Sequence, residues 1–124
     1  MGRNAYACCS ATHTVFGSDV IMAEGQYQNR IIRKLEALFP GCLVLKTDPE
    51  HRQGIPDLIV LWGKYWAGLE VKTSATSFRQ PNQDYYVEQL GEMSFAAYIY
   101  PECEKEVLGA LQQAFKSPRG ARVS

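Results

Sequence analysis

The stretch that decides the fold runs from residue 54 to residue 73 and reads GIPDLIVLWGKYWAGLEVKT. Residues 57–62 are nearly all apolar, which predicts a strand with both faces covered. Gly63 and Lys64 are a turn signal, and residues 66–73 predict the returning strand. The two runs therefore predict an antiparallel hairpin with a short turn.

The hairpin register can be counted from its turn. If Gly63-Lys64 is a two-residue turn, Trp62 pairs with Tyr65, and counting outward sets Asp57 opposite Glu70. Directly opposed side chains of an antiparallel pair are only about 5 Å apart. Two carboxylates at that distance repel each other unless a cation lies between them. Because oxygen ligands select hard cations, the pair predicts a Mg²⁺ or Mn²⁺ site.

Lys72 lies two residues beyond Glu70, so the two side chains point to the same face of the strand. Beside a bound metal, the ammonium group can orient an attacking oxygen or stabilise charge on a phosphate, which favours metal-assisted phosphodiester hydrolysis. The Val71 carbonyl is a candidate further metal ligand, and the number of metals stays open. A Glu and a Lys two apart often form only a solvated strand face. The opposing Asp57 favours the catalytic interpretation.

The rest of the chain predicts an α/β domain. From Ala23 onward, apolar residues at helical spacing predict a first helix that Pro40-Gly41 ends. Further elements are predicted as a strand over 42–46, a polar loop over 47–54, a helix from Pro81 to Gly91, a strand over 94–100 and a helix over 102–115. The predicted order is α-β-β-β-α-β-α. Residues 1–21 predict a weakly ordered extension, and 22–124 a single domain with a basic C-terminal tail.

Composition narrows the function classes without choosing one. The formal net charge is zero, which excludes a protein coated in basic residues. It is compatible with a nuclease, whose metal-binding acids and surrounding bases cancel. Neither a signal peptide nor an apolar run of membrane-spanning length is evident, so we expect a soluble, intracellular protein. Four cysteines match no zinc spacing. Cys8, Cys9, Cys42 and Cys103 could join His13 and His51 in a zinc site. The alternative is reduced thiols, with Cys42 and Cys103 partly buried.

Residues 54–60 (GIPDLIV) and 68–73 (GLEVKT) resemble the PD-(D/E)XK nuclease superfamily, most closely its VRR-NUC and phage or archaeal Holliday-junction-resolvase branches. The resemblance covers roughly Met22 to Phe115. It implies a restriction-endonuclease-like core, in which helices flank a central mixed β-sheet. It also implies a metal-dependent nuclease with Asp57, Glu70 and Lys72 as the catalytic residues.

Three further positions match this family. Glu24 occupies the place of a glutamate at the start of the first helix, and would complete the metal site directly or through water. The alternative for Glu24 is a first-turn acid that favours the helix dipole. Gln83 occupies the place of a glutamine that would orient Lys72 or a phosphate, with Gln80 as the rival. Lys46 ends the strand before the Gly-x-Pro-Asp loop, where arginine is commoner. The first 21 residues match nothing, and no DNA-binding module is recognisable.

Contacts to nucleic-acid phosphates need Lys and Arg around the site. Arg52 and Arg79 flank the two motifs and are the main candidates, although each could be a solvated surface charge. Tyr85 and Tyr86 could stack on bases, but helical spacing predicts that one of them lies in the core. The remaining candidates for contacts to nucleic acid are Lys46, Arg30, Arg33, Lys34, Lys64 and the basic C-terminus.

A chain of this size suggests an endonuclease selective for DNA structure. A four-way junction has two-fold symmetry and needs paired cuts, which a homodimer would supply. The expected protein is therefore a dimeric Holliday junction or branched-DNA resolvase of DNA recombination, encoded by a phage, with no membrane partner or organic cofactor. The alternatives are another PD-(D/E)XK nuclease (flap, fork or restriction-like) and a non-catalytic DNA-binding module of the same fold. DNA and RNA are not distinguished by the sequence.

Overall fold

The computed structural model describes residues 23–116, and the predictions for residues 1–21, for Cys8, Cys9 and His13, and for the tail after Lys116 lie outside this range. A four-stranded mixed sheet of order β1-β2-β3-β4 forms the centre of the fold. The elements are α1 (Glu24–Leu38), β1 (Leu43–Lys46), β2 (Leu58–Trp62), β3 (Tyr65–Val71), α2 (Pro81–Met93), β4 (Phe95–Ile99), the 3₁₀ turn η1 (Pro101–Cys103) and α3 (Glu104–Lys116). This confirms the predicted element order and the α/β class.

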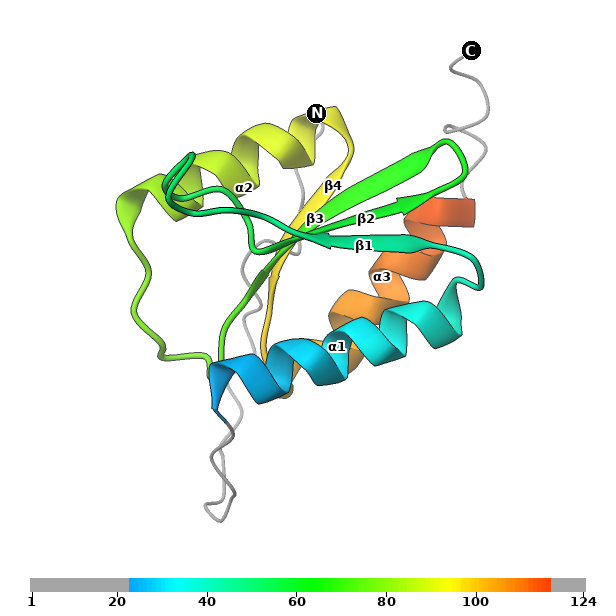
Figure 1. The fold of residues 1–124 in the computed structure, drawn as a ribbon, viewed down its shortest axis with the longest axis horizontal. Helices are drawn as coiled ribbons and strands as arrows, with labels where there is room; N and C mark the ends of the chain where they lie inside the picture. The colour runs from blue at the N-terminus through cyan, green and yellow to red at the C-terminus, as the bar shows by residue number, and fades with distance from the viewer. Residues whose placement is uncertain (1–22, 117–124) are drawn as a thin grey trace.

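Helices cover the two faces of the sheet unequally. Helices α1 and α3 pack on one face, and α2 lies on the other, over β3 and β4 (Figure 1). On α1 the buried side chains are Tyr27, Ile31 and Leu35, four residues apart, as expected for one stripe of a helix. Strands β3 and β4 run parallel, and α2 is the crossover between them. Residues 23–116 contain no helix long and apolar enough to cross a bilayer.

The hairpin has the predicted register, with Trp62 opposite Tyr65 and Leu58 opposite Leu69. The predicted bounds of its second strand were wrong at both ends, because β3 begins at Tyr65 and stops at Val71. The predicted last helix likewise begins at Glu104 instead of residue 102, because Pro101 starts a 3₁₀ turn first. These shifts leave the elements themselves in place.

The expectation that both faces of the strand over residues 57–62, now β2, are covered was also wrong. Leu58 and Val60 are fully buried, whereas Leu61 is 37% exposed. Its partner Leu43 on β1 is 53% exposed, and Leu45 is 45% exposed on the same face. The physical reason is that α2 lies over β3 and β4 and leaves the β1–β2 half of this face open.

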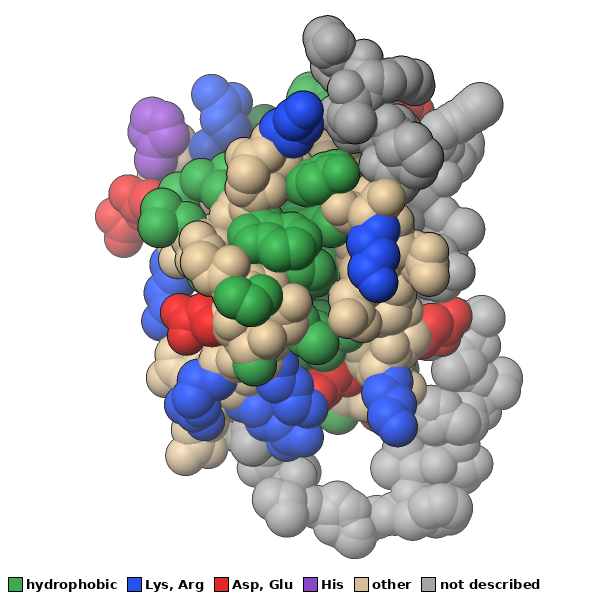
Figure 2. All heavy atoms as spheres, turned by 90° about the vertical axis from the view of Figure 1, so that its right-hand side faces the viewer, with side chains coloured by type: hydrophobic (Ala, Val, Ile, Leu, Met, Phe, Trp, Pro, Cys, Tyr) green, Lys and Arg blue, Asp and Glu red, His purple; other side chains and the backbone are tan. Residues whose placement is uncertain are grey.

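An aromatic cluster closes the hairpin end of the molecule. Phe115 of α3 stacks on Tyr65 and Trp62, with ring centroids 5.3 and 6.1 Å apart, and Phe39 packs against Phe115 at 5.0 Å. The Trp62 indole donates to the Pro40 carbonyl at 2.9 Å. Figure 2 shows this end of the molecule, where hydrophobic side chains gather in the middle of the face with Lys and Arg around them. The cluster fixes the hairpin tip, at the opposite end of β2 and β3 from Asp57 and Glu70.

Candidate active site

The local backbone before Asp57 depends on a glycine. Gly54 has a positive φ of 93°, and a Cβ atom on it would lie 2.4 Å from Asn82 Cβ. Only glycine fits such a position without strain. The loop from residue 47 to 56 therefore turns back against the start of α2, and Asp57 lies between this loop and β2. Thr47 anchors this end, because its amide donates to the Asp57 carbonyl at 2.9 Å.

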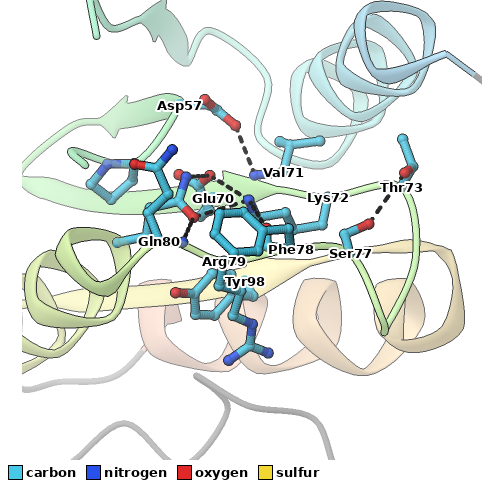
Figure 3. A network of polar contacts seen from close by, with 12 residues as sticks. Asp57, Glu70, Val71, Lys72, Thr73, Ser77, Phe78, Arg79, Gln80 and Tyr98 are labelled. Carbon is cyan, nitrogen blue, oxygen red and sulfur yellow. Dashed lines mark hydrogen bonds and ion pairs between the residues drawn. The ribbon is translucent and has the colours of Figure 1, made fainter. Parts of the chain in front are cut away.

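Asp57 and Glu70 share one end of the hairpin. Continuing the ladder one step past Leu58 and Leu69 sets Asp57 opposite Glu70. Asp57 Oδ2 accepts a 3.0 Å hydrogen bond from the Val71 amide. In an extended strand the amide and carbonyl of one residue point to the same side, so the Val71 carbonyl also faces Asp57. Two carboxylates and one carbonyl are thus placed at the same end of the sheet, where Figure 3 shows Asp57 directed at the Val71 amide beside Glu70.

Glu70 is buried at 2% exposure, which is unusual for an acid. Its Oε2 accepts a 2.7 Å hydrogen bond from Gln83 Nε2. Within the described chain, its Oε1 is buried and has no hydrogen-bond partner. An orphaned buried carboxylate oxygen is costly, and it points to a ligand that is not part of the chain.

The pKa values of Asp57 and Glu70 also indicate that this site binds a ligand, and that the ligand is a cation. Burial and then the charge of Asp57 raise the pKa of Glu70 to about 8, although Lys72 lowers it. Burial also raises the pKa of Asp57, and the charge of Glu24 adds to this. Because both groups are held back from ionising, a cation between them would be strongly favoured.

The donor set fits a hard divalent cation. In the described part of the chain, no group of three or more His, Cys, Asp or Glu side chains is placed to hold a metal. Mg²⁺ commonly uses one or two carboxylates and takes its other ligands from water and substrate phosphates. Asp57, Glu70 and the Val71 carbonyl match that pattern, and the orphaned Glu70 Oε1 supplies a free ligand atom.

Lys72 is fixed by three acceptors. Its Nζ donates to Gln83 Oε1 and to the Phe78 carbonyl, each at 3.0 Å, and lies 3.5 Å from Glu70 Oε2. Gln83 is in turn held by the Gln80 amide, which donates to its Oε1 at 3.0 Å. The Gln83 amide group therefore bridges the acid and the lysine, while Gln80 lies at the start of α2. Of the two rival glutamines, it is the Gln83 side chain that contacts Glu70 and Lys72.

Three other predicted site residues, Glu24, Arg52 and Lys46, lie around the acids. Glu24 is exposed on the first turn of α1, and its charge acts on Asp57. Arg52 donates to the Tyr86 hydroxyl at 3.4 Å, on the loop that precedes Asp57. Lys46 Nζ lies 3.5 Å from Asn29 Oδ1, at the end of β1. These three side chains border the sheet end that carries the acids.

Several predicted basic residues are not gathered at the acids. Lys34 pairs with the buried Glu104, which also accepts a 3.0 Å hydrogen bond from Tyr27, so this lysine joins α1 to α3. Lys64 is at the hairpin tip, roughly 17 Å from Asp57, since five residues of β2 separate the two. Arg30 is exposed on α1.

A cluster that the sequence did not predict lies beside Glu70. Tyr98 of β4 is its register partner. The Tyr98 hydroxyl donates to Asp84, and the Arg79 guanidinium lies over the Tyr98 ring, 3.9 Å from its centroid. Burial and the bonded carboxylate of Asp84 raise the pKa of Tyr98, so it stays a neutral donor. The parallel pairing of β3 with β4 creates this cluster, and no local sequence signal sets that register.

Two other side-chain predictions have definite outcomes. Neither Tyr85 nor Tyr86 lies in the core, because Val87 takes the buried position on α2 and leaves Tyr85 56% exposed. Cys42 is half-buried and Cys103 is buried, and both are free thiols. The expectation that these two cysteines are partly buried is therefore confirmed for Cys42 and exceeded for Cys103.

Two solved structures have a similar fold. One, described as a VRR_NUC domain, is 29% identical to this chain with a TM-score of 0.56, and the match covers 72% of this chain and 94% of that one. Another, described as a VRR_NUC domain protein, is 18% identical with a TM-score of 0.56, covering 78% and 91%. No protein-family model matches the chain, and no curated protein matches it. These neighbours carry a PD-(D/E)XK-type nuclease domain, so the restriction-endonuclease-like fold is confirmed and a nuclease is supported.

Proposed function

We propose that this protein is a divalent-metal-dependent endonuclease that hydrolyses phosphodiester bonds in DNA. The observation that carries the proposal is the buried Glu70 with an orphaned oxygen, opposite Asp57 and 3.5 Å from Lys72. A single buried acid would not by itself indicate catalysis. Two carboxylates and a lysine at one sheet end, in a fold shared with VRR_NUC domains, have a joint chemical purpose.

Asp57, Glu70 and the Val71 carbonyl would hold Mg²⁺ or Mn²⁺. The metal, when bound, supplies Lewis-acid polarisation of the phosphate and activation of the attacking water. Lys72 holds a positive charge beside the acids and would stabilise negative charge that develops on the scissile phosphate. Gln83 orients Lys72 and Glu70 relative to each other, because its amide group hydrogen-bonds to both. Glu24 would act on the same centre from the edge.

The favoured substrate is a branched DNA, above all the four-way Holliday junction. A junction has two equivalent strands to cut, and a homodimer would bring two copies of the site in matching orientation. Arg52, Arg79 and Lys46 would contact the phosphates around the cut. We propose that such an enzyme acts inside the cell, in DNA recombination, and that it is encoded by a phage.

A cleavage panel tests the proposal. The purified full chain is incubated with labelled four-way junction, flap, fork and plain duplex DNA, with Mg²⁺, with Mn²⁺ and with a chelator. We expect cleavage only with a divalent metal and fastest on the junction. The variants Asp57→Ala and Glu70→Ala should each lose at least about 100-fold in rate, as removal of catalytic machinery does.

Glu88→Ala is the matched control, because Glu88 is an exposed carboxylate on α2. It should cleave like the wild type. Retained cleavage in both Asp57→Ala and Glu70→Ala, with circular dichroism unchanged, would refute the assigned site. Equal cutting of plain duplex and junction would refute the preference for branched DNA and leave the nuclease intact.

A further inference from the structure

A residue with an exposed aromatic ring contacts the proposed catalytic lysine through its backbone. Of the large hydrophobic side chains in residues 23–116, Phe78 is the most exposed, at 76%. Its backbone carbonyl accepts the 3.0 Å hydrogen bond from Lys72 Nζ. The backbone of Phe78 is therefore fixed at the site, while its ring is exposed to solvent. Figure 3 shows Phe78 among the residues around Lys72.

A single exposed hydrophobic side chain is ordinary and needs no explanation. Phe78 differs because the next residue, Arg79, is a cation held in place. The guanidinium of Arg79 lies over the Tyr98 ring, 3.9 Å from its centroid, and its Nη1 is 3.6 Å from Asp84 Oδ1. A solvent-facing ring and a positioned cation thus stand next to each other along the chain, on the side of the site formed by β4.

An aromatic ring with an adjacent cation is the combination that binds single-stranded nucleic acid. Every base has a flat face on which the ring can stack, and the cation contacts the phosphate backbone. In a continuous duplex both faces of each base are already covered by its neighbours. The ring can therefore stack only where a base is unpaired or unstacked, as at a branch, a gap or a single-stranded arm.

We propose that Phe78 stacks on an unpaired base next to the scissile phosphate and that Arg79 contacts a phosphate of the same strand. Tyr98 and Asp84 act as positioning residues for Arg79. The placement at the scissile phosphate rests on the proposed endonuclease function, whereas the stacking itself does not. The implied substrate class is DNA with unpaired nucleotides at the cut, and fully paired duplex is disfavoured.

The first test measures binding without cleavage. Two fluorescein-labelled DNAs are compared by anisotropy in a chelator: a duplex with a short single-stranded flap, and the same duplex fully paired. Phe78→Ala should weaken binding of the flap DNA roughly 5- to 150-fold, the usual range for loss of one base–aromatic stack. Binding of the paired duplex should change less than about twofold. Phe78→Trp should bind the flap DNA as well as the wild type does.

Met93→Ala is the matched control, because Met93 is 64% exposed at the last residue of α2. It should leave binding of both DNAs unchanged. A 2-aminopurine base at the unpaired position gives a direct readout of stacking, and its fluorescence should respond to the wild type but not to Phe78→Ala. Equal weakening of both DNAs by Phe78→Ala, or no weakening, would overturn the inference.

The second test separates this inference from the proposed function. The same two DNAs are incubated with Mg²⁺ or Mn²⁺ and cleavage is followed. If the wild type cleaves and Phe78→Ala keeps the same ratio of rates on the two DNAs, the stacking role is refuted and the nuclease stands. If binding depends on Phe78 but no divalent metal supports cleavage, the nuclease is refuted and the stacking role stands.

Discussion

Glu70 is an acid whose surroundings oppose its ionisation. It is buried and it faces Asp57, while contacts with Gln83, Lys72 and the Asp57 backbone offset part of the cost of its charge. The folded protein therefore holds the Glu70 proton more tightly than the unfolded chain does, with a pKa of about 8 against an ordinary value of 4.5. Such a difference makes stability depend on pH.

The sign of this dependence is set by the raised pKa. The contribution of Glu70 is fully present below pH 4.5 and is lost as pH rises through about 8. We expect the metal-free protein to become less stable over this window by on the order of a few kcal/mol. Glu70→Gln, which cannot ionise, should flatten the profile. Urea unfolding in a chelator from about pH 5 to about pH 9 measures both, and parallel profiles would contradict the prediction.

Gln83 offers a second prediction at the scale of one residue. It links Glu70 to Lys72, and loss of such supporting contacts commonly costs roughly 10- to 100-fold in metal affinity or activity. We expect Gln83→Ala to lower kcat of DNA cleavage by about that factor. Gln89→Ala, an exposed glutamine of the same helix, is the control and should leave kcat unchanged. A similar small loss in both variants would argue against a role for Gln83.

Among the elements, the hairpin and its register could be predicted from the sequence. The register between β3 and its other neighbour, β4, could not. A two-residue turn at Gly63-Lys64 allows only one pairing register for the two strands, and this register sets Asp57 opposite Glu70. The partner of Glu70 on the other side, Tyr98, is reached through a crossover helix whose length does not set a register. Asp57, Glu70 and Lys72 could therefore be placed from the hairpin pattern, and Gln83 from the family resemblance. The Arg79, Asp84 and Tyr98 cluster needed the structure.

The loop before Asp57 depends on Gly54 in a way that a substitution can test. A methyl group there would meet Asn82 Cβ at 2.4 Å, on a backbone with φ of 93°. We expect Gly54→Ala to lower the free energy of unfolding by roughly 2 kcal/mol, from strain and displacement of the loop. Cleavage should fall as well, because Asp57 comes directly after this loop. Denaturant unfolding and the junction assay measure the two effects.

Gly25→Ala is the control for this substitution. Gly25 is helical, and a Cβ atom there would have no neighbour within 4 Å. Alanine should stabilise α1 by about 0.5–1 kcal/mol because it restricts the unfolded chain. If Gly54→Ala also stabilised the protein, the contact between the loop and α2 would not be a constraint.

At the scale of the whole molecule, the open half of the sheet is the surface available to a second copy. Strand β1 is an edge strand, and Leu43, Leu45 and Leu61 are exposed on one face beside it. Exposed apolar side chains on an edge strand favour association. We expect the protein to be a homodimer through this face, and Leu45→Glu to make it a monomer. Light scattering of the two proteins measures the mass.

Gln113→Glu, on the exposed face of α3, is the control for added charge and should stay dimeric. A wild type that is monomeric at all concentrations would contradict the dimer, and with it the paired cutting of a junction. A Leu45→Glu variant that stays dimeric would instead exclude this face as the interface.

The hairpin register also limits how the gene can change length. Asp57 and Glu70 face each other only because equal numbers of residues separate them from the turn. Deleting or inserting one residue between Tyr65 and Glu70 would turn Glu70 to the α1 face and move Lys72 with it. Extra residues at Gly63-Lys64 would lie outside the ladder and leave the pair aligned. Length variation in related genes should therefore concentrate at the hairpin tip and be absent from its strands.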